Sequence, residues 1–489
     1  MNAFSRRTFV KRAALAVGAG ALTRVVPSSW ARPIGANDAV RIAVIGLGGM
    51  GSYHARRIPT LPDARLAGIC DVDPQALARE VEYFQGAKIA VPAVTDPRRV
   101  LERDDVDAVM IATPNHWHAL LTVWACQAGK DVYVEKPVAH APWQGAQMVA
   151  AAEKYGRVVQ AGTQSRSDPT VPALRQFIAE GHAGKVQWIH ALTYKPRPLV
   201  AVRPEWVPDW LDYDLWCGPA PRRPLDRERL HYDWHFFWDT GNGDLGNLGV
   251  HQVDLACWLT GQEEMPARVM SFGGRFGPAD AAQTPNVQVT LLDYAGVPIL
   301  FENRGLPAKP DVSYSDHFHG TRTGFVVQCE AGYFAGYQGG AFYDHAGRKV
   351  RQFEGDGGGD HLPNFIRAVR NRAQERLAAP IQIGHRSTAK CLYGNVSYQL
   401  GAPSPLRELR AALETHPFAV EALDRVGEHV AAHGAKLNES SLVLGPWVTP
   451  TRDGAGVSAV EGGNAETLAR ARRLARPEER AGFAIPDAV

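Results

Sequence analysis

The chain has 489 residues, enough for two or three domains, and its 45% hydrophobic and 21% charged residues are ordinary for a soluble globular protein. Its formal net charge of +2 becomes −3 without the first 31 residues, so nothing in the charge suggests nucleic acid or a membrane surface as a partner. Six cysteines are scattered without a C-x-x-C pair, which favours small core residues over a disulfide framework or a zinc site.

Residues 1–31 are predicted to be a targeting segment. Arg6 and Arg7 form the twin-arginine pair of a Tat signal, an apolar stretch over 13–22 follows, and 29–31 offers a small-x-small cleavage site. No later apolar run is long enough for a transmembrane helix. We therefore expect a periplasmic or secreted protein that is exported in the folded state.

Export in the folded state constrains how a nucleotide cofactor would be used. The export compartment has no known pool of nicotinamide nucleotide for exchange. We hypothesise that a dinucleotide enzyme working there holds its cofactor tightly and returns it to its starting redox state in each turnover. This favours a redox-neutral cycle, or one that passes electrons to a second substrate.

The segment 41–51, R-I-A-V-I-G-L-G-G-M-G, predicts a dinucleotide site. An apolar run suited to a buried strand precedes three glycines in G-x-G-x-x-G spacing. In that spacing the first glycine allows a tight turn, the second lets the backbone approach a pyrophosphate, and the third lets the next helix pack closely. A carboxylate twenty residues after the last glycine suits the ribose hydroxyls. The predicted contacts are Gly46, Gly48, Gly49, Met50, Gly51 and Asp71.

From residue 39 to residue 162, strand patterns alternate with helical ones. The expected strands are 40–45, 65–70, 107–112, 131–134 and 157–161, and the helices between them include 74–84, 117–128 and 142–155. This alternation predicts an α/β domain with a doubly wound parallel Rossmann sheet. Three segments, 111–118, 134–137 and 161–164, lie at the carboxyl ends of strands, where such sheets bind ligands.

The segment 163–401 is predicted to be a second, α+β domain. After a helix over 170–180, strand patterns at 185–194, 265–272, 286–294, 297–303, 322–329 and 348–353 follow closely in sequence, which indicates a largely antiparallel sheet. One helix is expected over 362–372, and a second helix is expected to begin in the segment 383–388 and to run to residue 400. The C-terminal extension 402–489 has helical patches at 405–414, 418–432 and 464–475 but no functional motif.

Four motifs give the chain a resemblance to the Gfo/Idh/MocA oxidoreductase family over roughly residues 39–401. G-L-G-G-M-G, T-P-N-H-W-H, A-G-K-D-V-Y-V-E-K-P and the segment 243–261 occur in the family's order. The resemblance implies that Lys136 lies between nicotinamide and substrate, that Glu135 lies near the nicotinamide ribose, and that the loop with Thr113, Asn115 and His118 lines the cofactor. Gln164, at the end of the next strand, is a further expected cofactor contact. A metal site at the two histidines of T-P-N-H-W-H lacks a third ligand in view.

The segment 241–254 is expected to carry the chemistry. Asn247 and His251 are four residues apart, so they share a face on a helical turn. The family carries Asp-x-Gly-x-His here, which implies that His251 is the acid/base for the hydroxyl being oxidised. This chain has Asn247 at the Asp position, and an amide cannot hold an imidazolium as a carboxylate would. We therefore expect a lowered pKa at His251, unless Asp244 or Asp254 compensates.

Between the first two strands of the second domain lies a long insert, 195–245, rich in tryptophan and proline. Aromatic faces stack on the C–H faces of sugars, so a carbohydrate pocket is one interpretation, and packing of the insert against the domain is the other. The predicted substrate residues are Lys136, Tyr194, Trp216, Trp238 and His251.

These observations predict an NAD(P)-dependent oxidoreductase that acts on a hydroxyl of a sugar, sugar derivative or glycoside with tightly bound cofactor. No arginine follows Asp71, which favours NAD, although the exported relative glucose–fructose oxidoreductase holds NADP. Two alternatives stay open: a redox-neutral glycosidase like the NAD-dependent glycosidases of the family, and a non-catalytic sugar- or NAD-binding protein. By analogy with the family we expect a homo-oligomer formed through the second-domain sheet.

Overall fold

The computed structural model describes residues 39–436, 442–487 and 489. The predicted targeting segment 1–31 lies outside the described residues. In the described part of the chain, no helix is both long and apolar enough to cross a membrane. All six cysteines are free and buried, which agrees with their interpretation as core residues.

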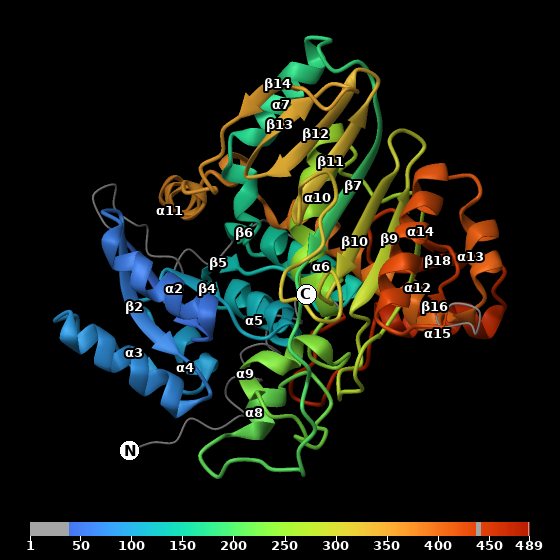
Figure 1. The fold of residues 1–489 in the computed structure, drawn as a ribbon. Coiled ribbons are helices and arrows are strands. Elements are labelled where there is room, and N and C mark those ends of the chain that lie inside the picture. The colour runs from blue at the N-terminus through green and yellow to red at the C-terminus, as the bar shows by residue number, and fades with distance from the viewer. Residues whose placement is uncertain (1–38, 437–441, 488) are drawn as a thin grey trace, which may run out of the picture. The chain divides into compact units, whose positions relative to one another are not determined.

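The first domain is built on a six-stranded parallel sheet with the strand order β3-β2-β1-β4-β5-β6 (Figure 1). The order reverses between β1 and β4, and in doubly wound sheets the ligand binds in the crevice at this point. The predicted Rossmann fold is therefore confirmed. The strands are β1 (Val40–Ile45), β2 (Ala64–Cys70), β3 (Ala93–Val94), β4 (Ala108–Ile111), β5 (Asp131–Val134) and β6 (Val159–Ala161).

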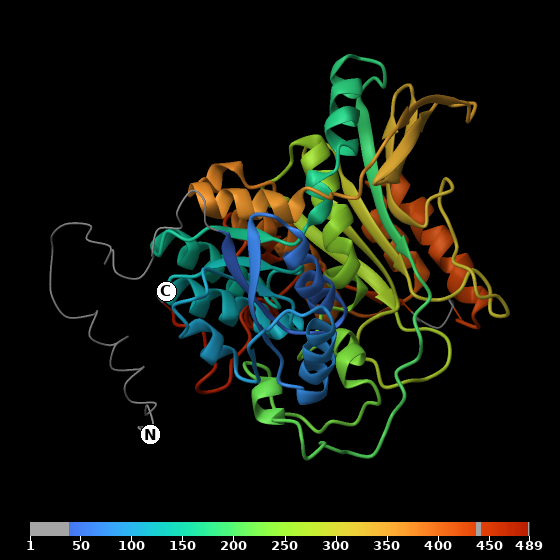
Figure 2. The same cartoon turned by 90° about the vertical axis from the view of Figure 1, so that its left-hand side faces the viewer.

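Helices cover both faces of this sheet. The buried apolar residues of α5 and α6 form one core cluster with the strands, and those of α2, α3 and the distant helix α11 form another. The contribution of α11 shows that the chain returns to the first domain after building the second sheet (Figure 2). The helices are α2 (Gly49–Arg57), α3 (Pro74–Gly86), α4 (Pro97–Leu101), α5 (Asn115–Gln127), α6 (Pro142–Lys154) and α11 (His361–Asn371).

The second sheet has twelve strands in the order β14-β13-β12-β11-β7-β10-β9-β8-β16-β15, with β17 pairing β8 and β18. Among the described strands of this sheet, only β10 and β7 pair in parallel, so the predicted, largely antiparallel sheet is confirmed. The strands are β7 (Val186–Tyr194), β8 (Arg268–Gly274), β9 (Val287–Asp293), β10 (Ile299–Arg304), β11 (Thr323–Cys329), β12 (Gly332–Tyr337), β13 (Gly339–Tyr343), β14 (Lys349–Phe353), β15 (Ala402–Ser404), β16 (Leu442–Leu444), β17 (Val448–Pro450) and β18 (Val457–Val460).

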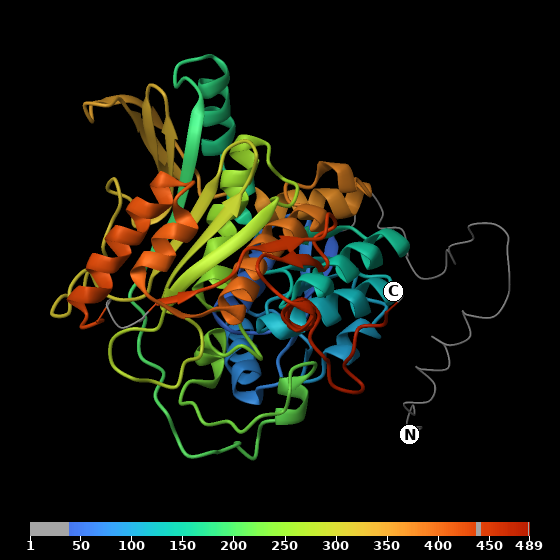
Figure 3. The same ribbon diagram turned by 90° about the vertical axis from the view of Figure 1, so that its right-hand side faces the viewer.

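The two faces of this sheet carry different helices. On the inner face α7 (Thr170–Ala179), α10 (Val250–Thr260) and α12 (Ile381–Leu400) share a core with the strands, and α15 (Ala465–Ala475) packs into the same cluster. On the outer face α13 (Leu406–Leu413) and α14 (Pro417–Ala432) cover β8, β9 and β10 (Figure 3). The C-terminal extension is thus part of the second domain's sheet and of its covering layer.

The last residues of the extension return to the first domain. Ile485 belongs to the core cluster of α5 and α6, and the ring of Phe483 lies edge-on to Trp117 with centroids 5.6 Å apart. The ammonium of Lys154 donates to the carbonyl of Val489 at 2.6 Å. The described residues of the segment 476–489, that is, 476–487 and 489, therefore form a strap that lies against the Rossmann domain.

The insert 195–245 is mostly irregular, as predicted. It holds two short helices, α8 (Tyr213–Cys217) and α9 (Leu230–Asp233), and runs past the α3–α4 side of the Rossmann domain (Figures 1 and 2). Short 3-10 turns occur at Ile58–Thr60, Gln164–Ser167, Trp234–Phe236 and Gln374–Arg376, and a π-helical turn at Leu245–Gly249 leads directly into α10.

Candidate active site

The glycine-rich loop has the geometry that a pyrophosphate requires. Gly46 has φ +90°, and a Cβ on Gly51 would lie 1.7 Å from the Gly46 carbonyl oxygen, so neither position accepts a side chain. A Cβ on Gly48 or Gly49 would meet nothing within 4 Å. Helix α2 begins here without a side-chain cap, so its first N–H groups remain available to an anion. Met50, in the same loop, is 44% exposed.

Asp71 lies directly after β2, beside this loop. Its carboxylate accepts hydrogen bonds from the backbone N–H of Leu47 at 2.6 Å and of Asp73 at 2.9 Å. Each carboxylate oxygen can accept a further bond, so the group can still take ribose hydroxyls. Burial raises the pKa of Asp71 above its ordinary value, and the two backbone donors counteract that rise.

Three other predicted cofactor contacts line the crevice or its floor. The hydroxyl of Thr113 is buried without a partner. The amide of Asn115 donates to Asn242 at 2.9 Å, and the amide of Gln164 donates to Glu135 at 3.0 Å. The open glycine loop, the ribose carboxylate and the unpartnered threonine hydroxyl fit a nicotinamide dinucleotide along this edge of the sheet.

The structure does not support His118 as a cofactor contact. Its ring is 1% exposed, and its two nitrogens lie 2.7 Å from the carbonyl oxygen of Pro137 and 2.8 Å from that of Thr113. Burial lowers its pKa. Its neighbour His116 has both nitrogens directed at carbonyl oxygens of the insert. His118 therefore ties the two strand-end loops together.

Glu135 is held at the end of β5 by two side chains. His54 lies 2.8 Å from Glu135 Oε1, and Gln164 donates to the same oxygen. Although burial opposes ionisation, the hydrogen bond from His54 and the charge of Lys136 leave the pKa of Glu135 below its ordinary value. The carboxylate is thus fixed and charged beside Lys136.

Lys136 and Asn247 meet across the two domains. The ammonium donates to the backbone carbonyl of Asn247 at 2.7 Å and to its side-chain oxygen at 3.0 Å. These bonds use two of the three N–H groups, so one remains for a substrate oxygen. Burial lowers the pKa of Lys136.

His251 lies one helical turn after Asn247, on the same face of the π-turn and α10. Burial, and then the charge of Lys136, lower the pKa of His251 to about 3, so the ring is neutral at physiological pH. Its Nδ1 is buried without a partner. Neither candidate carboxylate bonds to it: Asp244 pairs with Arg197, and Asp254 pairs with Arg166.

Two of the predicted substrate residues lie elsewhere. Tyr194 is 2% exposed on the outer face of the second sheet, clustered with Leu192 and Val326, whereas α10 and His251 cover the inner face. Trp216 is 4% exposed in the core of the insert. Tyr194 was misassigned because the sequence does not show which face of β7 points towards the site. Trp216 was misassigned because the sequence does not show which side chains of an irregular insert lie in its interior. Trp238 is half-buried, with its ring 6.4 Å from Tyr398 of α12.

Three residues of the site were not predicted: His54, Arg197 and His235. Arg197 donates to Asp244 through two nitrogens and to the hydroxyl of Tyr232 at 3.0 Å. His235 lies near enough to Lys136 for that charge to lower its pKa. The sequence offered one signal for His54, namely its position on the buried face of the helix that follows the glycine loop. The positions of Arg197 and His235 depend on the path of the insert.

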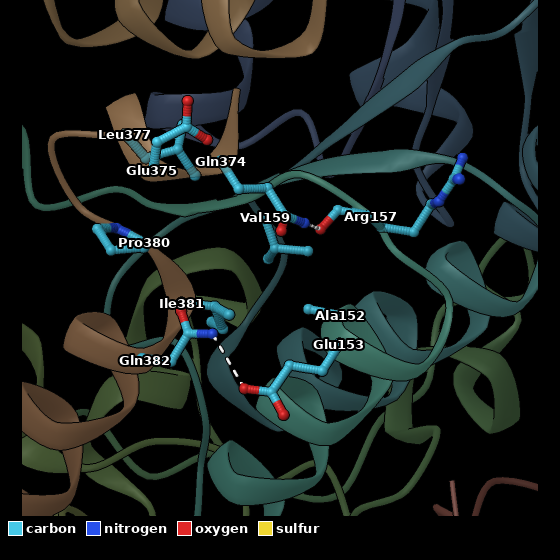
Figure 4. Close-up of a pocket in the computed structure, with 10 residues that line it drawn as sticks. All are labelled: Ala152, Glu153, Arg157, Val159, Gln374, Glu375, Leu377, Pro380, Ile381 and Gln382. Carbon is cyan, nitrogen blue, oxygen red and sulfur yellow. Dashed lines mark hydrogen bonds between the residues drawn. The ribbon is translucent and has the colours of Figure 1, made fainter. Parts of the chain in front are cut away.

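A separate hollow of about 280 Å³ lies between the end of α6 and the segment 374–382 (Figure 4). Its lining includes Glu153 and Gln382, which are joined by a hydrogen bond of 3.3 Å. It contains none of the predicted site residues and is not part of the candidate active site.

Comparisons with known proteins agree with this geometry. Residues 40–163 match the Gfo/Idh/MocA description "Oxidoreductase family, NAD-binding Rossmann fold", and residues 181–309 match its C-terminal alpha/beta domain, together about half of the chain. A solved WlbA dehydrogenase from Bordetella pertussis, in complex with NADH and UDP-GlcNAcA, superposes with a TM-score of 0.53 at 20% identity, covering 73% of this chain and 95% of that one. That likeness supports the fold.

Two curated relatives are more similar in sequence. A glycosyl hydrolase family 109 protein from Shewanella pealeana is 28% identical over 42% of this chain and 50% of its own length. A levoglucosan dehydrogenase from Pseudarthrobacter phenanthrenivorans is 25% identical over 54% of this chain and 65% of its own length. The chain thus matches about half to two thirds of the length of these relatives. The two family matches, the strand order and the glycine loop together establish that the chain belongs to the Gfo/Idh/MocA oxidoreductase family, with an NAD-binding Rossmann domain.

Proposed function

We propose that the protein is an NAD(P)-dependent oxidoreductase that acts on a hydroxyl of a sugar, sugar derivative or glycoside. One observation carries this proposal: Lys136 from the end of β5 bonds to Asn247, one turn before His251, so a hydrogen-bond donor and a neutral imidazole meet beside the dinucleotide crevice. A levoglucosan dehydrogenase among the relatives supports a carbohydrate substrate.

The side chains divide the work on the hydroxyl between them. The remaining N–H of Lys136 donates to the substrate oxygen and orients it, and the charge of Glu135 opposes the lowering of the Lys136 pKa by burial. The hydroxyl proton passes to Nε2 of His251, which is the base when the ring proton is on Nδ1. A nicotinamide bound in the crevice would supply the hydride acceptor for the carbon that bears this hydroxyl.

The insert supports slow exchange of the cofactor. His231 pairs with Asp73 at 2.8 Å, next to the ribose carboxylate, and Trp216 accepts hydrogen bonds at the start of α5 on the other side of the crevice. The adenosine end of the crevice is therefore bridged. We propose that a bound nucleotide leaves only when these contacts open.

The first test of the function is the nucleotide content of protein purified without added cofactor. We expect a nicotinamide absorbance or fluorescence band, and NAD or NADP in the supernatant after denaturation. Addition of levoglucosan, myo-inositol or D-glucose is then expected to change the redox state of that band. Protein that is empty and binds NAD only weakly would contradict tight retention.

Substitution of Lys136 by Met tests the catalytic role of the lysine. Loss of the donor is expected to lower kcat/KM by about 10²–10⁴-fold, which is typical of a lost acid–base or orienting group, with nucleotide binding retained. Steady-state kinetics and nucleotide titration measure the two effects separately. Unchanged turnover in this variant would leave a binding protein as the better explanation.

A redox-neutral glycosidase is the second candidate, because a glycosyl hydrolase family 109 protein is among the relatives. In that reaction the hydride returns to the sugar within one turnover, so no net NADH forms. Release of free sugar from an aryl glycoside without a lasting change in the nicotinamide band would favour this candidate over net oxidation.

We also propose export by the Tat pathway, on the basis of Arg6 and Arg7. Replacement of both arginines by lysine is expected to keep the protein in the cytoplasm, as measured by fractionation.

For the predicted homo-oligomer, the outer face of β11–β14 is the remaining candidate interface, because α13 and α14 cover β8–β10. Val350 is 56% exposed there, and light scattering of the purified protein tests the assembly.

A further inference from the structure

His235 of the insert is presented to the same site by a chain of hydrogen bonds. Arg197 binds Asp244, three residues before Asn247, and also donates to the hydroxyl of Tyr232. The backbone carbonyl of Tyr232 lies 2.6 Å from Nδ1 of His235. The segment that carries the predicted catalytic groups thus fixes the part of the insert that carries this histidine.

The hydrogen bond from His235 defines which of its nitrogens is free. A carbonyl oxygen only accepts, so Nδ1 must carry the ring proton, and Nε2 keeps its lone pair. Burial, and then the charges of Lys136 and Arg197, lower the pKa of His235 to about 3, so the ring stays neutral. Among the described residues, none hydrogen-bonds to Nε2, and this atom is not one of the buried unpartnered atoms.

The ring is also fixed in orientation. It stacks on Trp234 with the centroids 3.6 Å apart and an interplanar angle of 20°. Gly241 closes the turn behind it, because a Cβ there would lie 2.5 Å from the His235 carbonyl oxygen. A ring held in this way is preorganised to accept one hydrogen bond in a defined direction.

We infer that His235 is a substrate-contacting residue that accepts a hydrogen bond from a hydroxyl neighbouring the one that is oxidised. This inference rests on the proposed function and specifies its substrate class. Three of the five N–H groups of Arg197 bind Asp244 and Tyr232, Lys136 keeps one N–H for the substrate, and Nε2 of His235 is the added acceptor. Because Arg197 joins the segment of Asn247, which binds Lys136, to the turn that carries His235, this donor and this acceptor suit two hydroxyls of one substrate, that is, a polyol or sugar with a vicinal diol.

The test compares two variants on D-glucose and its 2-, 3- and 4-deoxy analogues. Replacement of His235 by Phe keeps an aromatic ring for Trp234 but removes the acceptor, whereas replacement by Gln keeps an acceptor. In the wild type we expect one deoxy analogue to lose at least tenfold in kcat/KM relative to D-glucose. In H235F the ratio of kcat/KM for D-glucose to kcat/KM for that analogue is expected to fall towards one, because activity on D-glucose is lost. H235Q is expected to restore part of this ratio.

Exposed His182 provides the control, because its side chain is 56% exposed and lies outside the site. H182F is expected to leave the ratio unchanged. A ratio that is the same in H235F as in the wild type would overturn the inference and assign His235 to packing alone.

Calorimetric binding of D-glucose and the deoxy analogues to nucleotide-loaded protein separates this inference from the proposed function. One outcome is that D-glucose binds in a way that depends on His235 but no hydride is transferred. In that case the oxidoreductase proposal fails and the His235 contact stands. If hydride is transferred but neither binding nor kcat/KM depends on His235, the reverse holds. Absence of both binding and turnover for every sugar of the set would overturn the inference together with the carbohydrate substrate.

Discussion

At the scale of single residues, the amide at position 247 distinguishes this site from the Asp-x-Gly-x-His pattern of the family. Both oxygens of Asn247 accept from Lys136, and no carboxylate bonds to His251. Burial and the charge of Lys136 outweigh the opposing charges of Glu135 and Asp254, which leaves the pKa of His251 at about 3. Because the neutral ring is the base, it is fully available at all pH values well above 3.

Replacement of Asn247 by Asp is expected to restore an acidic limb to the pH profile. A carboxylate near His251 favours the imidazolium, so the pKa of His251 rises by about one to three units. Activity that depends on the neutral ring is then lost as the pH falls through this higher pKa. The measurement is kcat/KM between pH 4 and pH 9 for both proteins. An identical profile would show that His251 is not the titrating base.

The loop glycines give a matched pair of substitutions. Gly48→Ala meets open space in the protein and is expected to leave the melting temperature nearly unchanged while it lowers NAD affinity at least tenfold, because the Cβ stands where the pyrophosphate must approach. Gly51→Ala forces a Cβ to 1.7 Å from a carbonyl oxygen and is expected to destabilise the fold itself. Calorimetry with and without NAD distinguishes the two effects. Equal loss of stability in both variants would contradict the different roles.

Some residues of the candidate site could be predicted from residue patterns in the sequence, and others could not. The glycine loop, Asp71, Glu135 and Lys136 follow strands whose ends share an edge of a parallel sheet, so their proximity could be derived from the alternation alone. Tyr194 failed because a strand with polar and apolar residues on both faces gives no sign of which face meets the cofactor. His54 and His235 could not be found, since their roles depend on partners 81 residues away and on the path of an irregular insert.

At the scale of elements, the insert acts as a bridge across the nucleotide crevice. It reaches Asp73 after β2 through His231, and the start of α5 through the Trp216 carbonyl. Val72 and Trp234 pack against its apolar core. Since these contacts come from both sides of the adenosine end, we expect the insert to restrain exit of a nucleotide even though it has little regular structure.

His231→Ala is expected to speed release of bound NAD about threefold. The histidine is half-exposed, so its pairing with Asp73 contributes at the modest level of a surface pair, and the apolar contacts of the insert remain. Stopped-flow displacement of NADH by excess NAD measures the rate. His345→Ala, in a turn of the second domain, is the control. A release rate unchanged from wild type would assign retention to the apolar contacts alone.

Elements with strong periodicity were predictable, and short ones were not. Five of the six Rossmann strands and most of the long helices agree with the expected ranges within a few residues, because each buries a continuous apolar face, whereas the two-residue β3 and the range of α10 were not predicted. Strands β12 and β13 were missed because glycines at 332, 336, 339 and 340 weaken the alternation that marks a strand. Strands β15–β18 pair with a sheet built much earlier in the chain, which no local pattern reveals.

At the scale of the whole molecule, residues from outside the predicted range of the Rossmann domain contribute to its core. Helix α11 completes one face of the Rossmann core, and the strap 476–489 adds to the other. The C-terminal extension, which has no motif, covers the outer face of the second sheet with α13 and α14. Stability and the nucleotide site are therefore coupled along the full length of the described chain.

Ile485→Ala tests the contribution of the strap. The side chain is 4% exposed within the Rossmann core, so its truncation is expected to cost about 2–4 kcal/mol of unfolding free energy. Because the strap packs against α5, NAD affinity is expected to fall as well. Val202→Ala, at a position that is 69% exposed in the insert, is expected to stay within about 0.5 kcal/mol of the wild type. Urea unfolding measures both variants, and equal stabilities would show that the strap is peripheral.

The position of the strap also sets the order of events during biosynthesis. The residues that finish covering α5 and α6 are translated hundreds of residues after these helices, since Lys154 and its partner Val489 are 335 residues apart. Until then the apolar face under Phe483 and Ile485 is open to water and to chaperones. The core between α5 and α6 is accordingly completed only once residues 483–485 have been translated.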